Sequence, residues 1–309
     1  MEAEGSLRHK GLREDTVSLP IYYFLSITAV NILMTWAIYL PYRVAHLHFI
    51  TIANMAISGY LAGYLVLTLK FPFFWALLIG FAVGGLIGYV VSLFIGDAPT
   101  FAVVIVGFTF IYISRTVIEN IPAIGGTMGM FGLPNIAKTP AGHRNLIIII
   151  LYGLVLLVGF LINRFDNSRL GKAASAVFVD KDLATSLGVD IKKLGQLLQI
   201  FSCIVAGGTG VLYGFIYKSF HLDFFTFHLV GIFMTTIFVG GYSTLWGSLL
   251  MAPILYGVPL LFPAEIQSWR MVIYGVILIL ILVLKPEGFI TRKFVYNIGI
   301  RLSRKREKI

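Results

Sequence analysis

The sequence has little cysteine and little charge, and both shortages limit what the protein can be. Cys203 is the one cysteine among 309 residues, so the chain cannot build a disulfide framework or a cysteine metal cluster. Charged residues make up 12% of the sequence, hydrophobic residues make up 58%, and the mean hydropathy is +0.89. This composition gives too much apolar surface for one soluble core, so we expect a polytopic membrane protein.

The positive charges are concentrated in two short segments. Of the 24 Lys and Arg residues, six lie in residues 163–199 and eight lie in residues 285–308, each group beside an apolar run. The positive-inside rule predicts that such segments lie on the cytoplasmic side of a membrane. The net charge of +10 is also typical of nucleic-acid binding, but no basic groove with interleaved aromatic residues accompanies it. We therefore expect no nucleic-acid partner.

Two motifs are also missing from the chain. Four glycines lie between Gly125 and Gly132, but the phosphate-binding pattern G-x-x-x-x-G-K-[ST] occurs neither there nor elsewhere. Any transport must therefore draw its energy from a gradient or from another polypeptide. Residues 1–18 form a polar tail of mixed charge and lack the features of a cleaved signal peptide, so we expect none.

Apolar runs separated by polar breaks fill residues 19–290 and predict an all-α bundle of about eight to ten transmembrane helices. About 20 apolar residues suffice to cross a hydrocarbon core of about 30 Å. Four crossings between the two basic segments place both on one side of the membrane. The expected spans are residues 19–40, 44–69, 71–95, 101–114, 145–162, 197–217, 229–240, 248–262 and 270–284.

The second apolar run, residues 44–69, contains polar side chains such as Asn54 and Ser58. Such groups are tolerated in a membrane where they face protein or a water-filled path, so this run can be a broken or re-entrant helix that lines a lumen. The side on which the N-terminus lies depends on this point. For His46 and His48 we favour a position at the membrane interface over a metal site, because no carboxylate lies nearby.

Two spacings predict contacts within and between helices. Gly84 and Gly88 form a small-xxx-small pattern that permits close helix packing. Arg115 and Glu119 are four residues apart and can pair at a helix end near the interface. A charged pair in a transport path is the alternative for these two residues.

The longest polar interruption, residues 163–199, predicts a helix–turn–helix that lies on the membrane face. Helix-favouring residues precede and follow Asp180 and Asp182, which can cap the second helix. Gly188 suits the left-handed residue that ends a helix. The alternative is a solvated loop, because charge between membrane spans is common.

Four segments carry a family resemblance. RLGKAASAVFVDKDLATSLGVDIKKLGQLLQIFSCIVAGGTGVLYG resembles the cytoplasmic loop and following helix of the M-type permease subunits of branched-chain amino acid ABC importers. GGYSTLWGSLLMAPIL, WRMVIYGVILILILVLKPEGF and GGTMGMFGLP are similar to the glycine turn, closing helix and external glycine loop of these subunits. The segments follow the order of the family and cover about residues 120–290.

The resemblance implies a permease domain at residues 19–290 and a basic cytoplasmic tail at residues 291–309, with no catalytic site and no cofactor. It also implies a coupling helix that docks in a cleft of an ATPase subunit. The residues expected to make that contact are Ala173, Ala174, Asp180, Asp182, Ala184, Leu187 and Gly188. Docking would require Ala174 and Ala184 to stay small and Gly188 to keep its conformational freedom.

The partners implied by the resemblance are two ATPase subunits, a second permease and an external solute-binding protein, in the inner membrane of a bacterial cell. The second permease is a homologue or a second copy of this chain. The chain departs from the family pattern at residues 39–64 and 177–182. The solute is therefore a branched-chain amino acid or a related amino acid, amide or urea-type compound.

Hydroxyl and amide side chains at the expected membrane depth are candidates to line a path for the solute. Hydrogen bonding between helices is the alternative role for each of them. The candidates are Thr51, Asn54, Ser58, Thr109, Thr235 and Thr236.

Two other classes of function stay open at this point. A gradient-driven carrier would need ionisable residues in the middle of its spans, whereas the charges here lie near the expected helix ends. A membrane enzyme would need His, Asp or Glu clustered at one depth, and the sequence shows no such cluster. Co-purification with an ATPase separates the importer from both.

Overall fold

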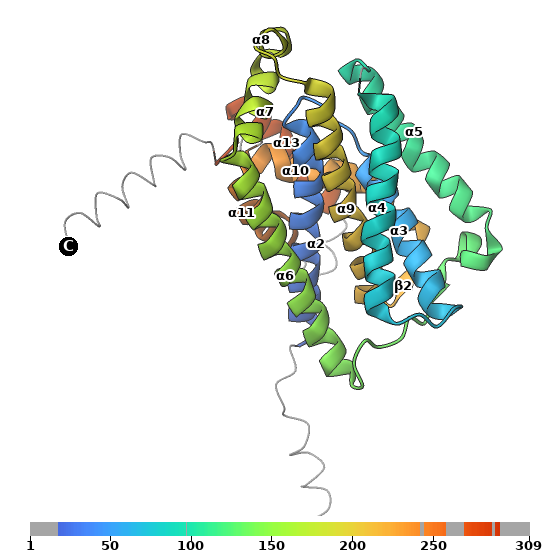
Figure 1. Ribbon diagram of the computed structural model, residues 1–309. Coiled ribbons are helices and arrows are strands. Elements are labelled where there is room, and N and C mark those ends of the chain that lie inside the picture. The colour runs from blue at the N-terminus through green and yellow to red at the C-terminus, as the bar shows by residue number, and fades with distance from the viewer. Residues whose placement is uncertain (1–17, 97, 242–243, 258–268, 286–287, 291–309) are drawn as a thin grey trace, which may run out of the picture.

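The computed structural model describes residues 18–96, 98–241, 244–257, 269–285 and 288–290, and its long elements are all α-helices (Figure 1). Both expected tails lie outside these residues, apart from Ser18. Within the described residues, seven helical stretches are long and apolar enough to cross a membrane, the last of them formed by η3 (Leu222–Phe224) and α10 together. The helices are α2 (Leu19–Tyr42), α3 (Ile50–Leu67), α4 (Phe73–Ile95), α5 (Thr100–Glu119), α6 (Pro140–Asp166), α9 (Ile191–Tyr217) and α10 (Phe227–Gly240).

Two further apolar helices are shorter. They are α11 (Leu245–Ala252), which continues as one π-helical turn at Pro253–Gly257, and α13 (Arg270–Leu284), which has the predicted bounds. The predicted break at residues 263–269 lies almost entirely outside the described residues. The prediction of an all-α polytopic bundle is confirmed. The part of the chain that the structure describes contains seven long spans and two shorter apolar helices, where about eight to ten spans were expected.

Helix α2 runs through the centre of the bundle and packs against α9, α6, α11 and α10. Nearly all its residues from Thr28 to Pro41 are buried, polar ones included. Two hydrogen bonds tie it to its neighbours: the Trp36 indole donates to the carbonyl of Leu245 at 3.1 Å, and the Ser202 hydroxyl donates to the carbonyl of Ala37 at 2.5 Å. Movement of α2 therefore affects both α9 and α11.

Glycines let α9 approach its neighbours closely. A Cβ atom on Gly84 of α4 would overlap the carbonyl oxygen of Cys203, and one on Gly88 would lie 2.7 Å from the Cβ of Cys203. On the other side, a Cβ atom on Gly210 would overlap the carbonyl oxygen of Met55 in α3. The packing predicted from the spacing of Gly84 and Gly88 is therefore confirmed, and α9 is the helix that they pack against.

The second apolar run begins without helical structure, because α2 ends at Tyr42 and α3 begins at Ile50. His46 lies against Gly195 of α9, and His48 lies against Gly107 of α5. Their exposed fractions are 6% and 1%, so protein encloses both side chains. The link between the helices therefore folds inward, and the position of the two histidines at the depth of the membrane interface stays a prediction.

A two-stranded sheet closes the end of the bundle where α2 starts. Strand β1 (Met130–Phe131) pairs antiparallel with β2 (Ser219–Phe220), with Met130 opposite Phe220. The glycine-rich loop ahead of β1 contains the 3-10 turns η1 (Pro122–Ile124) and η2 (Gly126–Met128). Gly129 has a φ of +82°, and a Cβ atom there would overlap the carbonyl oxygen of Phe220, so this turn requires glycine.

Arg115 lies near the same end of the bundle. Its guanidinium pairs with Glu119 at 2.8 Å, as predicted, and also with Asp223 at 3.1 Å. The second pair joins the end of α5 to the turn η3 that follows the sheet. The ion pair with Asp223 and the pairing of β1 with β2 thus connect the segments that follow α5 and α9 at this end of the bundle.

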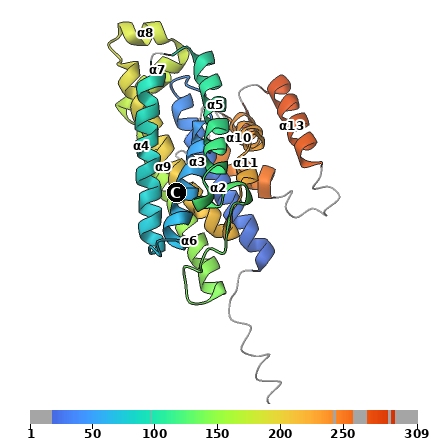
Figure 2. The same cartoon turned by 90° about the vertical axis from the view of Figure 1, so that its right-hand side faces the viewer.

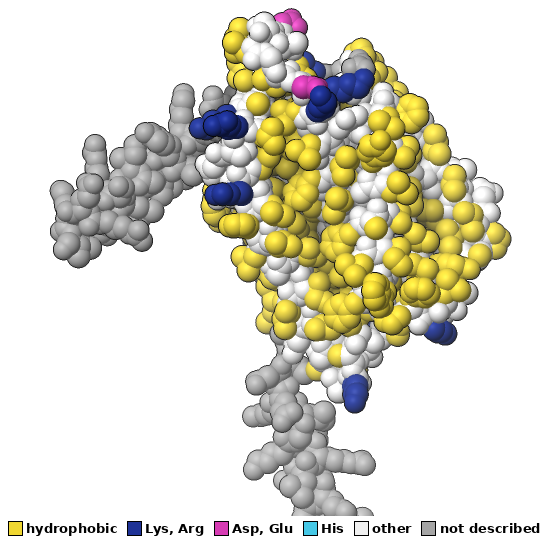
Figure 3. Space-filling model, viewed as in Figure 1, with side chains coloured by type: hydrophobic (Ala, Val, Ile, Leu, Met, Phe, Trp, Pro, Cys, Tyr) yellow, Lys and Arg dark blue, Asp and Glu magenta, His cyan; other side chains and the backbone are white. Residues whose placement is uncertain are grey.

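The surface between the two ends of the bundle is apolar. Figure 3 shows hydrophobic side chains across the face formed by α4, α5 and α6, with Lys and Arg at the top, at the left edge and at the bottom. Phe94, Phe101 and Leu156 are 79%, 77% and 74% exposed. Continuous apolar surface of this extent is covered by lipid or by other protein.

Replacing Gly84 with Leu is expected to destabilise the bundle by about 1–3 kcal/mol, because the added side chain overpacks the contact between α4 and α9. The measurement is the thermal unfolding midpoint of the purified chain in detergent. Gly153→Leu is the matched control, because nothing lies within 4 Å of a Cβ atom built there on α6. Equal midpoints for the two variants would contradict the packing described above.

Candidate functional site

The polar residues between α6 and α9 fold into two short helices, α7 (Arg169–Val179) and α8 (Lys181–Ser186). The Ser168 hydroxyl caps α7 by accepting from the Gly171 amide at 3.2 Å, and an Asp180 carboxylate oxygen caps α8 by accepting from the Leu183 amide at 3.0 Å. Gly188 follows α8 with a φ of +84°. The predicted helix–turn–helix is confirmed, although Asp182 lies in the first turn of α8 and the capping residue is Asp180 alone.

The two helices protrude from one end of the bundle. Figures 1 and 2 show α7 and α8 at the top, opposite the start of α2, with α8 beyond the ends of α6 and α9. A turn between helices in this position is free to contact another protein. We call residues 169–188 the protruding segment.

The protruding segment turns one side inward. Gly171, Ala174 and Val177 recur at every third position of α7 and are buried. A Cβ atom on Gly171 would overlap the carbonyl oxygen of Phe165, so the tight turn from α6 into α7 requires glycine there. The segment is therefore fixed to the bundle and is not a loosely solvated loop.

Its outward side carries apolar side chains. Val179, Leu183 and Leu187 are 85%, 59% and 74% exposed, and the last two are four residues apart. Asp180 and Asp182 are exposed beside them. Three large apolar side chains at a tip beyond the spans are typical of a surface that another protein covers.

The structure places the predicted alanines differently from the docking hypothesis. Ala174 and Ala184 have exposed fractions of 0% and 1% and pack inside the chain, and Ala173 is half-buried. The packing within this chain therefore requires Ala174 and Ala184 to be small. A Trp at position 184 would disturb α8 itself, so the variant Ala184→Trp cannot separate docking from folding, and contact of Ala184 with an ATPase stays a prediction.

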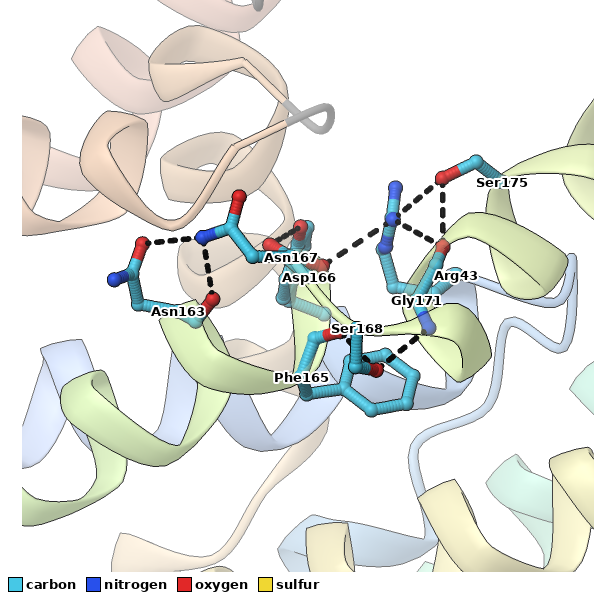
Figure 4. Close-up of polar contacts among 9 residues, drawn as sticks. Arg43, Asn163, Phe165, Asp166, Asn167, Ser168, Gly171 and Ser175 are labelled. Atoms are coloured by element: carbon cyan, nitrogen blue, oxygen red, sulfur yellow. Dashed lines mark hydrogen bonds and ion pairs between the residues drawn. The ribbon is translucent and has the colours of Figure 1, made fainter.

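A polar cluster attaches the protruding segment to the end of α2 (Figure 4). The Arg43 side chain is 6% exposed, and its Nη2 lies 3.2 Å from Asp166 Oδ1, the last residue of α6. The same nitrogen donates to Ser175 Oγ at 2.8 Å and to the Gly171 carbonyl at 3.3 Å. The contact with Oδ1 is an ion pair rather than an aligned hydrogen bond, since no donor points at that oxygen.

Tyr39 completes the cluster from the preceding turn of α2. Its hydroxyl donates to Asp166 Oδ2 at 3.2 Å, and its ring lies 5.8 Å from the Arg43 guanidinium carbon. The sequence gives little sign of this cluster, because an arginine directly after an apolar span is common at helix ends. Only the approach of α2 to α7 shows that Arg43 is buried and bonded.

The predicted path residues fall into separate groups. Thr51, Asn54 and Ser58 are fully buried in α3, where the Asn54 amide donates to the Cys203 carbonyl of α9 at 2.7 Å and Ser58 donates to Asn54 at 3.3 Å. Thr235 and Thr236 are buried in α10 and donate to carbonyls of their own helix. Thr109 is exposed on α5. In this conformation, the alternative of hydrogen bonding between helices fits Asn54 best.

Titratable side chains that could bind a metal are dispersed. In the part of the chain that the structure describes, no three His, Cys, Asp or Glu residues form a group that could hold a metal ion. Burial, together with the smaller effect of the nearby positive charge of Lys181, lowers the pKa of His46 to about 4. Burial likewise lowers the pKa of His48 to about 4. Both rings are therefore neutral at physiological pH.

Comparison with known proteins gives one clear match. A family model described as the permease component of branched-chain amino acid transport systems matches residues 20–282. Searches of curated proteins and of solved structures return no match. The matched range includes the protruding segment and all seven long spans except Leu19, the first residue of α2.

Replacing Gly188 with Val is expected to loosen α8, because a β-branched residue at positive φ costs roughly 1–2 kcal/mol. Amide hydrogens of residues 181–188 should then exchange about 5–30 times faster, while exchange in the spans is unchanged. Gly188→Asn is the matched control, since Asn tolerates the left-handed conformation. Unchanged exchange in the Val variant would show that α8 does not depend on this turn.

The lowered pKa values of His46 and His48 predict acid sensitivity. Above pH 6.5 both states of the chain hold neutral histidine, so the contribution to stability is complete. As pH falls from 6.5 towards 4, the unfolded chain binds protons first, and each histidine lowers the free energy of unfolding by up to about 3 kcal/mol. His46→Asn should flatten the fall in the unfolding midpoint between pH 6.5 and 4, and an unchanged slope would contradict the assignment.

Proposed function

The chain belongs to the family of permease components of branched-chain amino acid transport systems, and from this premise we propose that it is a membrane-spanning subunit of an ABC importer. As a permease component it is a multi-pass membrane protein and is not itself catalytic. In the proposed role, it carries a branched-chain amino acid or a related small polar solute across the inner membrane of a bacterial cell. Separate ATPase subunits hydrolyse the ATP.

The observation that carries this proposal is the exposed apolar tip of the protruding segment. Val179, Leu183 and Leu187 are 85%, 59% and 74% exposed, on helices that are anchored firmly to the bundle. A protruding segment that is fixed to the bundle and has an apolar tip suits docking in a cleft of an ATPase, because closing of the cleft can then move the bundle. Asp180 and Asp182 border the tip and add polar contacts at its rim.

The charges of the protruding segment support a cytoplasmic position for it. Arg169 and Lys172 on α7 are exposed, and Lys192 and Lys193 follow at the start of α9. Short basic segments beside spans lie on the cytoplasmic side. The opposite end, with the sheet β1–β2 and the Arg115 ion pairs, is then the external face where a solute-binding protein docks.

The complete transporter would contain two permeases and two ATPase subunits. The second permease is a homologue or a second copy of this chain, and it would cover part of the apolar surface that lipid does not. A path between two permeases is lined by side chains exposed on each, a condition that Thr109 meets. Thr51, Asn54 and Ser58 could join such a path only in a conformation that separates α3 from α9.

Transport then follows from the states that ATP favours. The ATPase pair holds the two protruding segments in different positions with and without ATP. The conformation of the bundle changes with them, because each state of the ATPase pair binds one conformation more tightly than the other. A gradient-driven carrier would instead need an ionisable side chain inside a span. Among the described residues, Arg43 is the one Lys, Arg, Asp or Glu below 9% exposure, and it lies at a helix end, paired with Asp166.

The test is recovery of an ATPase with the tagged chain from its native membrane. The wild-type chain should bring down stoichiometric ATPase, whereas a chain with Leu183→Asp and Leu187→Asp should recover about tenfold less, because unpaired charge enters an apolar contact.

Thr185→Asp with Ser186→Asp is the matched control, since it adds the same charge at exposed polar positions of α8 and leaves both leucines in place. No ATPase with the wild-type chain would overturn the proposal. Uptake of leucine, urea and short amides by proteoliposomes with the binding protein would identify the solute.

A further inference from the structure

The protruding segment touches the bundle at more than its two chain connections. Besides α6 and α9, which continue into it, it contacts the end of α2 through side chains about 130 residues away in sequence. A coupling element joined only to α6 and α9 would move those helices first. The added contact reaches the helix at the centre of the bundle directly.

The geometry of this contact is specific. Tyr39 and Arg43 are four residues apart at the end of α2, so they lie on one face, and Gly171 and Ser175 have the same spacing on α7. Arg43 Nη2 donates to both α7 residues, at 3.3 Å and 2.8 Å, while Tyr39 and Arg43 hold the two oxygens of Asp166. Arg43 therefore bonds to two positions one turn apart on α7, and Asp166 at the end of α6 is held from two positions at the end of α2.

An aromatic contact lies beside the polar one. The Tyr42 ring meets the ring of Phe178 edge to face, with centroids 5.3 Å apart, and it also meets Phe238 of α10 at 6.2 Å. Consecutive residues of α2 thus hold α7 by a charged cluster and by ring packing. The position of α7 is fixed relative to α2 and α10.

A buried charge makes the junction resistant to partial opening. Arg43 is 6% exposed at its side chain, and an arginine that lost Asp166, Ser175 and Gly171 would stay charged in a poorly solvated place. The contact between α7 and the end of α2 therefore moves as one body, or it separates at a high cost in free energy. A rigid contact of this kind is needed if movement of the protruding segment is to move α2.

We propose that Arg43 is the positioning residue through which displacement of the protruding segment is passed to α2, and through α2 to α9 and α11. This inference rests on the proposed function, because it assigns the route by which ATPase movement reaches the bundle. The contacts of Trp36 with Leu245 and of Ser202 with Ala37 carry the displacement onward. Arg43 makes no contact with ATP or solute in this role.

The first arm of the test uses the isolated chain in lipid nanodiscs and needs no ATPase. Arg43→Gln should raise amide hydrogen exchange about tenfold in residues 169–179 and in the last turn of α2, the factor expected on losing a charge-assisted hydrogen bond. Arg164→Gln is the matched control, an exposed arginine at the end of α6. Equal exchange in both variants would overturn the proposal.

The second arm uses the assembled transporter in proteoliposomes and compares solute taken up with ATP hydrolysed. Arg43→Gln should lower uptake about tenfold to a hundredfold while ATP hydrolysis stays within about twofold of wild type, because the ATPase still docks on the protruding segment. Arg164→Gln should leave both rates unchanged. An Arg43→Gln transporter with wild-type uptake per ATP would overturn the proposal.

A second variant guards against simple misfolding. Arg43→Met with Asp166→Leu replaces the buried ion pair by apolar side chains, a change that often leaves proteins equally stable. This variant should assemble and hydrolyse ATP but still lose uptake, since its side chains cannot bond to Gly171 and Ser175. Wild-type uptake in this variant would refute the role of Arg43. If the wild-type complex shows no ATP-driven uptake, the proposed function fails, and the exchange measurement alone decides whether Arg43 joins α7 to α2.

Discussion

The close approach of α9 to α3 and α4 is the contact on which the rest of the structure depends. Gly84 and Gly88 of α4 leave room for the backbone at Cys203, and Gly210 of α9 leaves room for the carbonyl of Met55 in α3. Apolar helices gain little from the hydrophobic effect inside a bilayer, so close van der Waals contact between backbones supplies much of the attraction. Polar side chains then bond across the contact, as Asn54 does with the carbonyl of Cys203.

The surroundings of a side chain, lipid or water, also explain how the spans differ from the protruding segment. Within the spans, polar groups such as Asn54 and Ser202 turn inward and bond to carbonyls of neighbouring helices, because lipid offers no partner. Beyond the spans, the protruding segment does the reverse and exposes Val179, Leu183 and Leu187. Apolar side chains exposed where water would surround them are typical of a surface that another protein covers, and this supports the proposed docking on an ATPase.

A permease of this kind has to transmit movement without doing chemistry. The proposed route for this movement runs from α7 through Arg43 and Tyr42 to α2, and from α2 to α9 and α11 by hydrogen bonds. The opposite end is closed by the paired strands β1 and β2 and by the ion pairs of Arg115. At both ends of the bundle, contacts thus join elements that are distant in sequence.

The sequence by itself determined the membrane class, most span positions, the helix–turn–helix after residue 163 and the Arg115–Glu119 pair. Each of these follows from local information, namely apolar runs, capping residues and helical spacing. Only the tertiary structure decided which faces meet. It buried Ala174 and Ala184 that docking was expected to use, enclosed His46 and His48, and paired Arg43 with Asp166, 123 positions along the sequence. A pattern along one helix shows that a residue is small, polar or charged, but its partner is set by how separate helices pack.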